Sequence, residues 1–342
     1  MAMKREEIER FRLEAYPADV KEQIYLTYEG VDGSTAEIPL HLIKGADSGP
    51  VLLMLAAIHG DEYEGVQTII ELGRMLSPTD IRGTLLMVPI ANEYAYRAAD
   101  RLTPEDGRNL AREFPGKREG TATERLAWHL GKGLIAKADF LLDMHSGGTY
   151  YEVPEFVGYY DNEDNDTGRR SRAAAEAFGF EVLWGHDQVS PGRTVSYAGD
   201  CGIPWLYTEA FGGRRVKYDE QQRLRQGALR LMRHLSMLAN PTQWIQEEVI
   251  PEIRYRLTGS GDFDGSVTAE EEGFFIPSVA LLQNVRQGDV IGNVYNGFGE
   301  TIRSYRAICG GVIVGLAGTP ALKQGSLVYL IARSHHPAQA GI

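Results

Sequence analysis

Residues 51–65 read VLLMLAAIHGDEYEG, and this stretch decides the fold. Its first part, Val51–Ile58, is an uninterrupted apolar run. A short apolar run bounded by glycine and polar residues is typical of a strand that is buried on both faces of a sheet. The run stops at His59, and helical spacing of apolar residues follows over Tyr63–Leu76. The stretch therefore predicts a buried strand, a turn that carries polar side chains, and a helix.

The same succession of strand and helix recurs before residue 240. The further apolar runs are Thr84–Ile90, Ala138–Met144 and Pro204–Thr208, and the further segments with helical spacing are Thr123–Ala136, Thr167–Phe178 and Tyr218–Met237. Strands that alternate with helices predict an α/β fold with a mostly parallel sheet. Sites in such folds lie outside the carboxyl ends of the strands. His59, His145 and Glu209 each stand at the end of a predicted strand, so we expect them at one edge of the sheet.

The sequence pattern changes after residue 240. Asn240–Arg256 is polar and contains two prolines, which is typical of a connector. From Leu257 to Ala332, short apolar stretches alternate with glycine-containing turns, and this spacing predicts a small all-β barrel or sandwich. We therefore expect two domains, residues 1–245 and residues 246–342.

The composition limits the possible classes of function. The 342-residue chain has a formal net charge of −12, which argues against a nucleic-acid partner because phosphate binding needs a basic surface. Its two cysteines, Cys201 and Cys309, exclude a disulfide scaffold and favour a reducing compartment. The charged N-terminus has no apolar signal segment, and the apolar runs are far shorter than the ~20 residues of a membrane span. We expect a cytoplasmic protein with no membrane partner.

Two histidines and a glutamate are the residues best suited to bind a metal. His59 and Glu62 are separated by two residues at the predicted strand-to-helix turn, and His145 follows Met144. Such a set is a known catalytic zinc site that leaves one position open for water or substrate. The alternative is that both histidines are hydrogen-bonded core residues. Asp143 lies on the same side of its strand as His145, where it would either orient that ligand or make an ordinary structural hydrogen bond.

Four ordered motifs give the chain a family resemblance. They are HGDEYEG at His59–Gly65, DGRNLAREFPG at Asp106–Gly116, DMHSGG at Asp143–Gly148 and TEAFGG at Thr208–Gly213. Together they resemble the succinylglutamate desuccinylase/aspartoacylase family of the zinc carboxypeptidase-like superfamily, and within it a bacterial branch that includes N-acetyl-diaminobutyrate deacetylases. The resemblance implies a mixed α/β sheet flanked by helices, with a small C-terminal β domain of barrel-sandwich type.

The resemblance also implies a hydrolase that removes the acyl group from a small N-acylated amino acid or diamine. By position, His59, Glu62 and His145 correspond to the ligands of one Zn²⁺ per chain, and Glu209 corresponds to the catalytic glutamate. Zinc lowers the pKa of its water from ~15.7 towards 7 and polarises the amide carbonyl. Glu209 would take the water proton and later deliver it to the leaving amine.

Further residues of the implied site lie between residues 101 and 112. Arg101 stands where the family carries the arginine that stabilises the oxyanion, and Arg112 matches the arginine that binds the substrate carboxylate. Asn109 is a further substrate-binding candidate. The alternative is that these arginines form a solvated loop face. The family has asparagine where this chain has Ala111, and alanine lacks the amide that would hydrogen-bond the substrate. We therefore expect a different acyl-amine substrate or weaker binding of an α-carboxylate.

Two other functions stay open. A zinc carboxypeptidase would use the same metal chemistry on peptides in a more open cleft, and a ligand-binding pseudoenzyme, suggested by Ala111, would keep the fold without turnover. We expect a homo-oligomer, and a C-terminal domain that narrows the mouth of the site or builds the oligomer interface. The histidines without ligand spacing are His41, His129, His186 and His234, and the tandem His335-His336 is assigned to a disordered tail.

Overall fold

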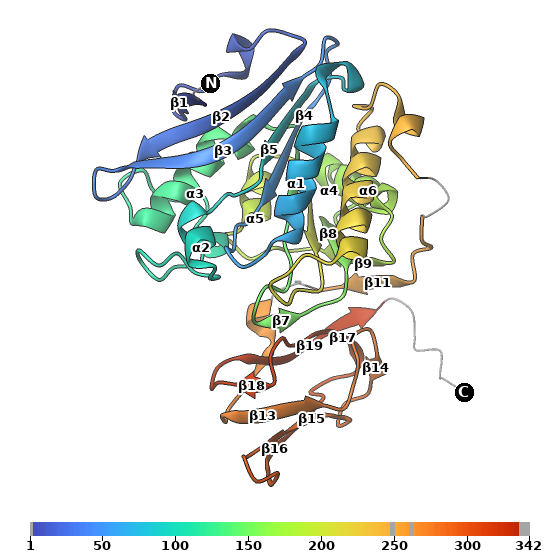
Figure 1. Cartoon of the computed structure of the whole chain (residues 1–342). Coiled ribbons are helices and arrows are strands. Elements are labelled where there is room, and N and C mark those ends of the chain that lie inside the picture. Colours follow the sequence, from blue (N-terminus) through green and yellow to red (C-terminus); the bar gives the residue numbers. More distant parts are fainter. Residues whose placement is uncertain (1–2, 247–249, 260–262, 335–342) are drawn as a thin grey trace.

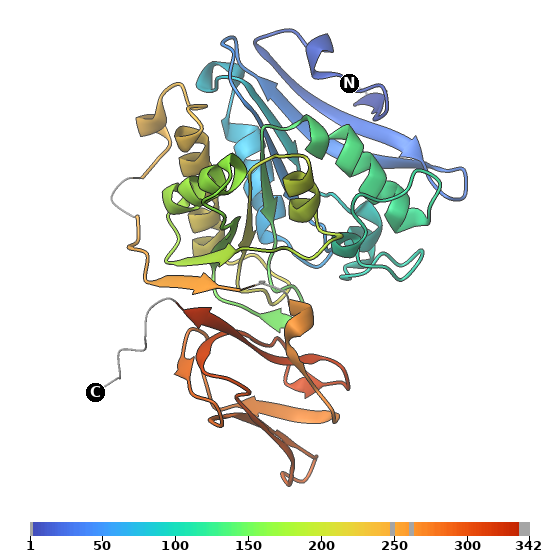
Figure 2. The ribbon, with the colours of Figure 1, turned by 180° about the vertical axis from the view of Figure 1, so that it is seen from behind.

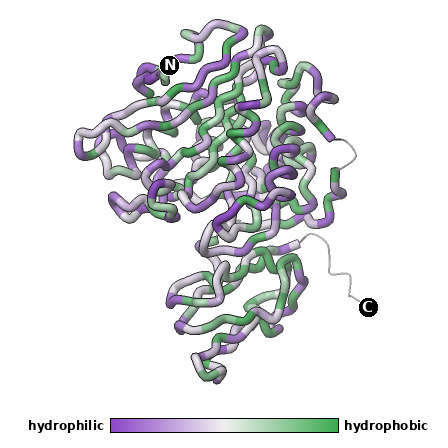
Figure 3. The backbone as a smooth tube through the Cα atoms, in the orientation of Figure 1, coloured by the Kyte–Doolittle hydropathy of each residue, from purple (hydrophilic) through white to green (hydrophobic). Residues whose placement is uncertain are grey.

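The computed structural model describes residues 3–246, 250–259 and 263–334, so His335 and His336 lie outside the described residues. Figure 1 shows a large lobe of helices around a sheet and a smaller lobe of strands at the C-terminal end of the chain. Hydrophobic residues concentrate along the central strands of the large lobe (Figure 3). None of the helices within the described ranges is both long and apolar enough to cross a membrane.

A mixed sheet forms the centre of the large lobe. Its strands, in spatial order, are β1 (Lys4–Glu7), β2 (Val20–Glu29), β3 (Thr35–Lys44), β5 (Thr84–Val88), β4 (Val51–Ala56), β6 (Phe140–Met144), β10 (Trp205–Glu209), β8 (Phe156–Tyr160), β9 (Val182–His186) and β11 (Tyr255–Thr258). The central strands β5, β4, β6 and β10 are parallel neighbours, whereas β3 and β8 flank them in the antiparallel direction. The predicted α/β fold is confirmed, with a mixed sheet.

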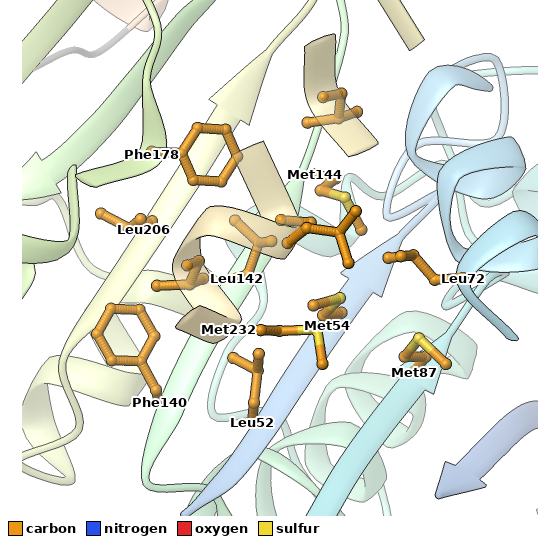
Figure 4. Packing of buried hydrophobic residues seen from close by; sticks show 14 of the residues in the cluster. Leu52, Met54, Leu72, Met87, Phe140, Leu142, Met144, Phe178, Leu206 and Met232 are labelled. Carbon is orange, nitrogen blue, oxygen red and sulfur yellow. The ribbon is translucent and has the colours of Figure 1, made fainter. Parts of the chain in front are cut away.

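Helices cover both faces of this sheet (Figure 1, Figure 2). One face carries α1 (Glu64–Met75), α4 (Asp166–Phe178) and α6 (Tyr218–His234), and the other carries α3 (Ala122–Gly133) and α5 (Thr194–Asp200). Side chains of β4 alternate between the two layers. Leu52 and Met54 pack with Leu72 of α1 and Met232 of α6 (Figure 4), whereas Leu53 and Leu55 belong to the opposite core. Burial on both faces explains why this strand is apolar throughout.

The structure contains every helix that the spacing predicts, and each begins and ends within three residues of its expected bounds. Several elements were not expected. They are the long strands β2 and β3, the strands β8 and β9, and the short helices α2 (Glu93–Ala98) and α5. The two long strands mix polar and apolar residues because each is only partly buried, so neither contains an uninterrupted apolar run.

The small lobe consists of strands in two sheets. One sheet contains β19 (Leu327–Ser334), β17 (Gly311–Ala317), β14 (Asn284–Val285), β12 (Val267–Thr268) and β7 (Tyr151–Glu152), and the other contains β16 (Thr301–Arg306), β15 (Val290–Tyr295), β13 (Gly273–Pro277) and β18 (Ala321–Leu322). Phe275, Val294 and Val328 are buried in a core that both sheets share. The barrel-sandwich class and the domain boundary at residue 245 stay predictions.

The predicted connector Asn240–Arg256 is wrong at its C-terminal end. Tyr255 and Arg256 belong to β11, which pairs in parallel with β9 of the large lobe and antiparallel with β19 of the small lobe. β7, from the middle of the chain, also pairs with β17. Strand pairing of this kind depends on partners far away in the sequence, so the local composition of the connector could not reveal it. The two lobes are therefore joined by continuous hydrogen-bonded strands.

The carboxyl ends of β4, β6 and β10 lie level with one another. Ala56 is opposite Met144, and Met144 is opposite Thr208. Gly65, in the first turn of α1, controls how closely that helix approaches these strand ends. A Cβ on Gly65 would lie 2.7 Å from the Cβ of Met144 and 2.9 Å from the Cβ of Ala56. The absence of a side chain at this position therefore sets the distance between the start of α1 and the end of β6.

Replacement of Gly65 by alanine should lower the free energy of unfolding by about 1–3 kcal/mol, because the helix or the strands must move to relieve the contact. The matched control is Gly199→Ala in α5, where the nearest atom to an added Cβ is Nε1 of Trp205 at 3.6 Å. Urea unfolding of both variants checks the expectation. Equal stability of the two variants would show that α1 is not in tight contact with the sheet.

Candidate metal centre and pocket

His59, Glu62 and His145 form a compact cluster. Nδ1 of His59 lies 2.8 Å from Oε1 of Glu62, and Nδ1 of His145 lies 3.0 Å from Oε2 of the same carboxylate. One potential ligand atom from each residue lies within 4.8 Å of the others. His59 and Glu62 are buried, and the side chain of His145 is largely buried. The structure thus brings together the three residues that the sequence assigns to a metal.

The local backbone explains how these side chains meet. His59 follows β4, and Glu62 precedes the first turn of α1. Gly60 between them lies against α2: its N–H donates to the carbonyl of Asp100, and a Cβ on it would come within 2.0 Å of the Ala95 carbonyl group. Only glycine fits in this space. His145 directly follows β6, and its N–H donates to the carbonyl of Thr208 in β10.

Two acceptors orient the imidazole rings. Nε2 of His59 donates to Oδ1 of Asn109 at 3.0 Å, and Nε2 of His145 donates to Oδ2 of Asp143 at 3.0 Å. Asp143 also accepts a hydrogen bond from the hydroxyl of Thr194. With a proton on Nε2, each neutral ring directs the lone pair of Nδ1 towards the Glu62 carboxylate. Lone pairs that face an anion repel it, so the arrangement requires a proton or a cation between these groups.

The electrostatics of the cluster agree with this requirement. Burial alone would lower the pKa of His145, but the carboxylates of Asp143 and Glu62 raise it well above its usual range. Burial would raise the pKa of Glu62, but the two neighbouring imidazoles hold it far below its usual range. The carboxylate therefore stays charged and favours a proton on His145, whereas burial and the charge of Arg101 lower the pKa of His59.

A pocket opens beside the cluster. Its lining residues are His59, Arg101, Ala111, Arg112, Asp143, His145, His186, Val189, Arg193, Thr194, Val195, Tyr207, Glu209 and Phe263. Glu209, the last residue of β10, is thus on the same pocket as the two histidines. Burial, reinforced by the charge of Glu62, raises the pKa of Glu209 to about 8. A carboxyl group with such a pKa can both accept and donate a proton near neutral pH.

Arg101 contacts the cluster directly. Its Nη1 lies 3.2 Å from Oε1 of Glu62 and 3.3 Å from Nδ1 of His59, and its guanidinium stacks over the ring of Tyr151 at 4.9 Å from the centroid. Its side chain is only 15% exposed. The alternative of a solvated loop face therefore does not describe Arg101.

Arg112 and Asn109, the two predicted substrate-binding residues, have different surroundings: Arg112 lines the pocket, whereas Asn109 contacts His59. Arg112 lines the pocket, where Nε and Nη2 each donate at 2.9 Å to the carboxylate of Asp264 from the small lobe. Asn109 uses its carbonyl oxygen for His59 and for the backbone N–H of Ala111. In this structure Asn109 therefore orients a histidine. Ala111 lines the pocket, as the sequence comparison with the family suggested.

Four polar residues of the pocket were not expected: His186, Arg193, Thr194 and Tyr207. His186 ends β9 and is buried, with Nδ1 donating to the carbonyl of Gly259 at 2.7 Å and Nε2 accepting from the hydroxyl of Tyr207 at 2.8 Å. Arg193 is the residue before α5. None of these residues stands in a motif with ligand spacing, so only the packing of β9, β10 and α5 brings them to the pocket.

His186 should make the protein acid-sensitive. Burial lowers its pKa to about 4, whereas an unfolded histidine titrates near 6.5. As the pH falls from about 6.5 to 4, the unfolded state takes up a proton that the folded state does not, and stability is lost, by up to about 3 kcal/mol. Urea unfolding of wild type and His186→Gln between pH 7 and 4 tests this. The difference in stability between the two proteins should shrink as the pH falls, and a constant difference would contradict the expectation.

The fold and the site define a mixed α/β protein with a His-Glu-His cluster at the carboxyl ends of its central strands. A model of the succinylglutamate desuccinylase/aspartoacylase catalytic domain matches residues 48–235, more than half of the chain. The chain therefore belongs to the succinylglutamate desuccinylase/aspartoacylase family. The predicted family resemblance is confirmed.

Individual relatives are similar over almost the whole chain. The N-alpha-acetyl-L-2,4-diaminobutyric acid deacetylase of Halomonas elongata is 29% identical over 298 residues, which cover 86% of this chain and 85% of the relative. The crystal structure of a succinylglutamate desuccinylase from Silicibacter sp. TM1040 superimposes with a TM-score of 0.82 at 27% identity, covering 94% of this chain and 98% of that one. A product-bound structure of the ectoine utilization protein EutE from Ruegeria pomeroyi gives a TM-score of 0.81 at 28% identity, covering 93% and 98%.

Proposed function

We propose that this protein is a zinc-dependent deacylase that hydrolyses the amide bond of a small N-acylated amino acid. The observation that carries the proposal is the convergence of His59, Glu62 and His145 on a pocket that also contains Glu209 and Arg101. The relatives named above support it, because their names describe deacylation of N-acyl amino acids. An N-acetylated diamino acid is therefore the first substrate to test.

The donor set fits one Zn²⁺ per chain. His59 and His145 would offer Nδ1, and Glu62 would offer its carboxylate, while Asn109 and Asp143 hold the rings in the required orientation. When bound, zinc supplies Lewis-acid activation of the water and of the amide carbonyl. The positive charge would also remove the repulsion between the two ring lone pairs and the carboxylate.

Glu209 is suited to act as the general base. In the proposed reaction it takes a proton from the attacking water and delivers that proton to the nitrogen of the leaving amine. Arg101 points its guanidinium at the same wall of the pocket as His59, where it would stabilise the oxyanion of the tetrahedral intermediate. Arg112 would bind the carboxylate of the substrate through its planar fork.

A residue of the small lobe narrows the space beside the candidate metal centre, as a small substrate would require. Phe263, from the short 3₁₀ helix Phe263–Gly265 of the small lobe, lines the pocket and lies 5.5 Å from the ring of Tyr151 between centroids. The small lobe therefore contributes to the wall of the site. This supports the deacylase proposal over the carboxypeptidase alternative. The homo-oligomeric state and the cytoplasmic location stay predictions.

Metal content and hydrolysis of a panel of N-acyl amino acids test the function directly. Wild type should contain about one zinc per chain and release the acyl group, and Glu209→Gln should keep the zinc while losing at least ~10³-fold in kcat, because the base is removed. Glu209→Asp serves as the matched control that retains a carboxylate. A zinc-free wild type after purification in zinc-containing buffer, or full activity of Glu209→Gln, would overturn the proposal.

Asp143 should tune the affinity for zinc. Asp143→Ala removes the acceptor that fixes the ring of His145, so zinc affinity should fall about 10- to 100-fold. Thr194→Val removes only the hydroxyl that donates to Asp143 and should have a smaller effect. Competition with a chromogenic chelator measures both affinities. Unchanged zinc binding in Asp143→Ala would show that its hydrogen bond is merely structural.

A further inference from the structure

The carboxylate of Asp264 binds to two arginines that line the pocket, Arg112 and Arg193. Oδ2 and Oδ1 of Asp264 accept hydrogen bonds from Nε and Nη2 of Arg112, both at 2.9 Å. Nη2 of Arg193 lies 3.5 Å from Oδ2 of the same carboxylate. Paired hydrogen bonds of this kind are the geometry with which arginine binds the carboxylate of a ligand. Asp264 therefore sits where such a ligand would sit.

The two arginines are held side by side by their backbones. The N–H of Phe114 donates to the carbonyl of Gly192 at 2.9 Å, and a Cβ on Gly192 would lie 2.3 Å from the carbonyl oxygen of Arg112. Arg193 is fixed in addition through its N–H, which donates to Oγ of Ser196 in α5. Both arginines line the pocket that contains His59, His145 and Glu209. The pair is thus a preformed anion site next to the candidate metal centre.

Asp264 and a substrate carboxylate cannot use this site together. Nε and Nη2 of Arg112 are the edge that binds a carboxylate in a bidentate manner, and both donate to Asp264, while Nη1 donates to the carbonyl of Ala111. The hydrogen bonds from Arg112 also lower the pKa of Asp264, which keeps it charged at neutral pH. A carboxylate ligand must therefore displace Asp264 to reach the same edge.

Moving Asp264 away from the arginines should cost little free energy. The side chain of Asp264 is 61% exposed, and it belongs to a short 3₁₀ helix of the small lobe. Solvent exposure of Asp264 weakens the ion pair, although bidentate pairing with Arg112 keeps it stronger than most exposed pairs, so the expected penalty on ligand affinity is about tenfold. Such a contact can keep the arginines paired in the free protein and still yield to a ligand.

We propose that Asp264 is an internal competitor for the substrate carboxylate and a determinant of substrate affinity. This inference rests on the proposed deacylase function. In the free enzyme Asp264 pairs with Arg112 and lies near Arg193, and an N-acyl amino acid replaces it with its own carboxylate. Asp264 thus lowers the apparent affinity of every ligand that places a carboxylate on this edge of Arg112.

Steady-state kinetics of wild type and Asp264→Asn test the proposal. The variant keeps the shape of the side chain and removes its charge, so the KM for an N-acetyl amino acid with a free carboxylate should fall about 3- to 10-fold. The KM for the corresponding carboxamide should fall less than that for the acid, because a neutral amide gains less from the uncovered guanidinium charge, and kcat should change much less than KM. The matched control is Glu270→Gln, since Glu270 is an equally exposed acid of the small lobe that pairs with Arg303 instead.

A rise in KM for the free acid, an unchanged KM, or an equal fall for acid and carboxamide would overturn the proposal, because Asp264 would then orient Arg112 or have no role. Calorimetric binding of the same acid to Glu209→Gln, with and without Asp264→Asn, separates this outcome from a failure of the proposed function. If wild type hydrolyses nothing, tighter binding in the double variant still supports the competition, and the absence of any gain still overturns it.

Discussion

The buried carboxylate of Glu62 is the group on which the site depends. Its two oxygens lie within 3.0 Å of Nδ1 of His59 and of His145, and Nη1 of Arg101 lies 3.2 Å from one of them. A buried carboxylate is stable only beside positive charge and hydrogen-bond donors, so the neighbours of Glu62 decide its state. Asn109 and Asp143 hold the rings so that both lone pairs face inward. Several residues thus fix the orientation of a group that could hold a metal ion.

The central sheet is what makes this arrangement possible. β4, β6 and β10 are parallel neighbours in level register, so three residues far apart in the sequence emerge at one edge. Gly60 and Gly65 allow the β4–α1 turn to approach that edge without a side chain in the way. Burial on both faces of the strands supplies the stability that keeps the ends in place.

The small lobe contributes residues to the candidate site and is joined to the large lobe by strand pairing. β11 is hydrogen-bonded to β9 on one side and to β19 on the other, so the lobes are connected through backbone pairing. Phe263 lines the pocket and Asp264 pairs with Arg112, so both the shape and the charge of the mouth depend on this lobe. The wall of the pocket therefore contains residues from both lobes.

The sequence by itself determined the features that depend on local pattern: the buried strands such as Val51–Ala56, the helices that follow them, and the motif that places His59 and Glu62 on one turn. Apolar runs and helical spacing report directly on burial. Only the tertiary structure decided the pairing of β11, the position of His186 on the pocket and the contact of Asp264 with Arg112. These contacts join residues with no common motif, and long-range packing leaves no local trace in the sequence.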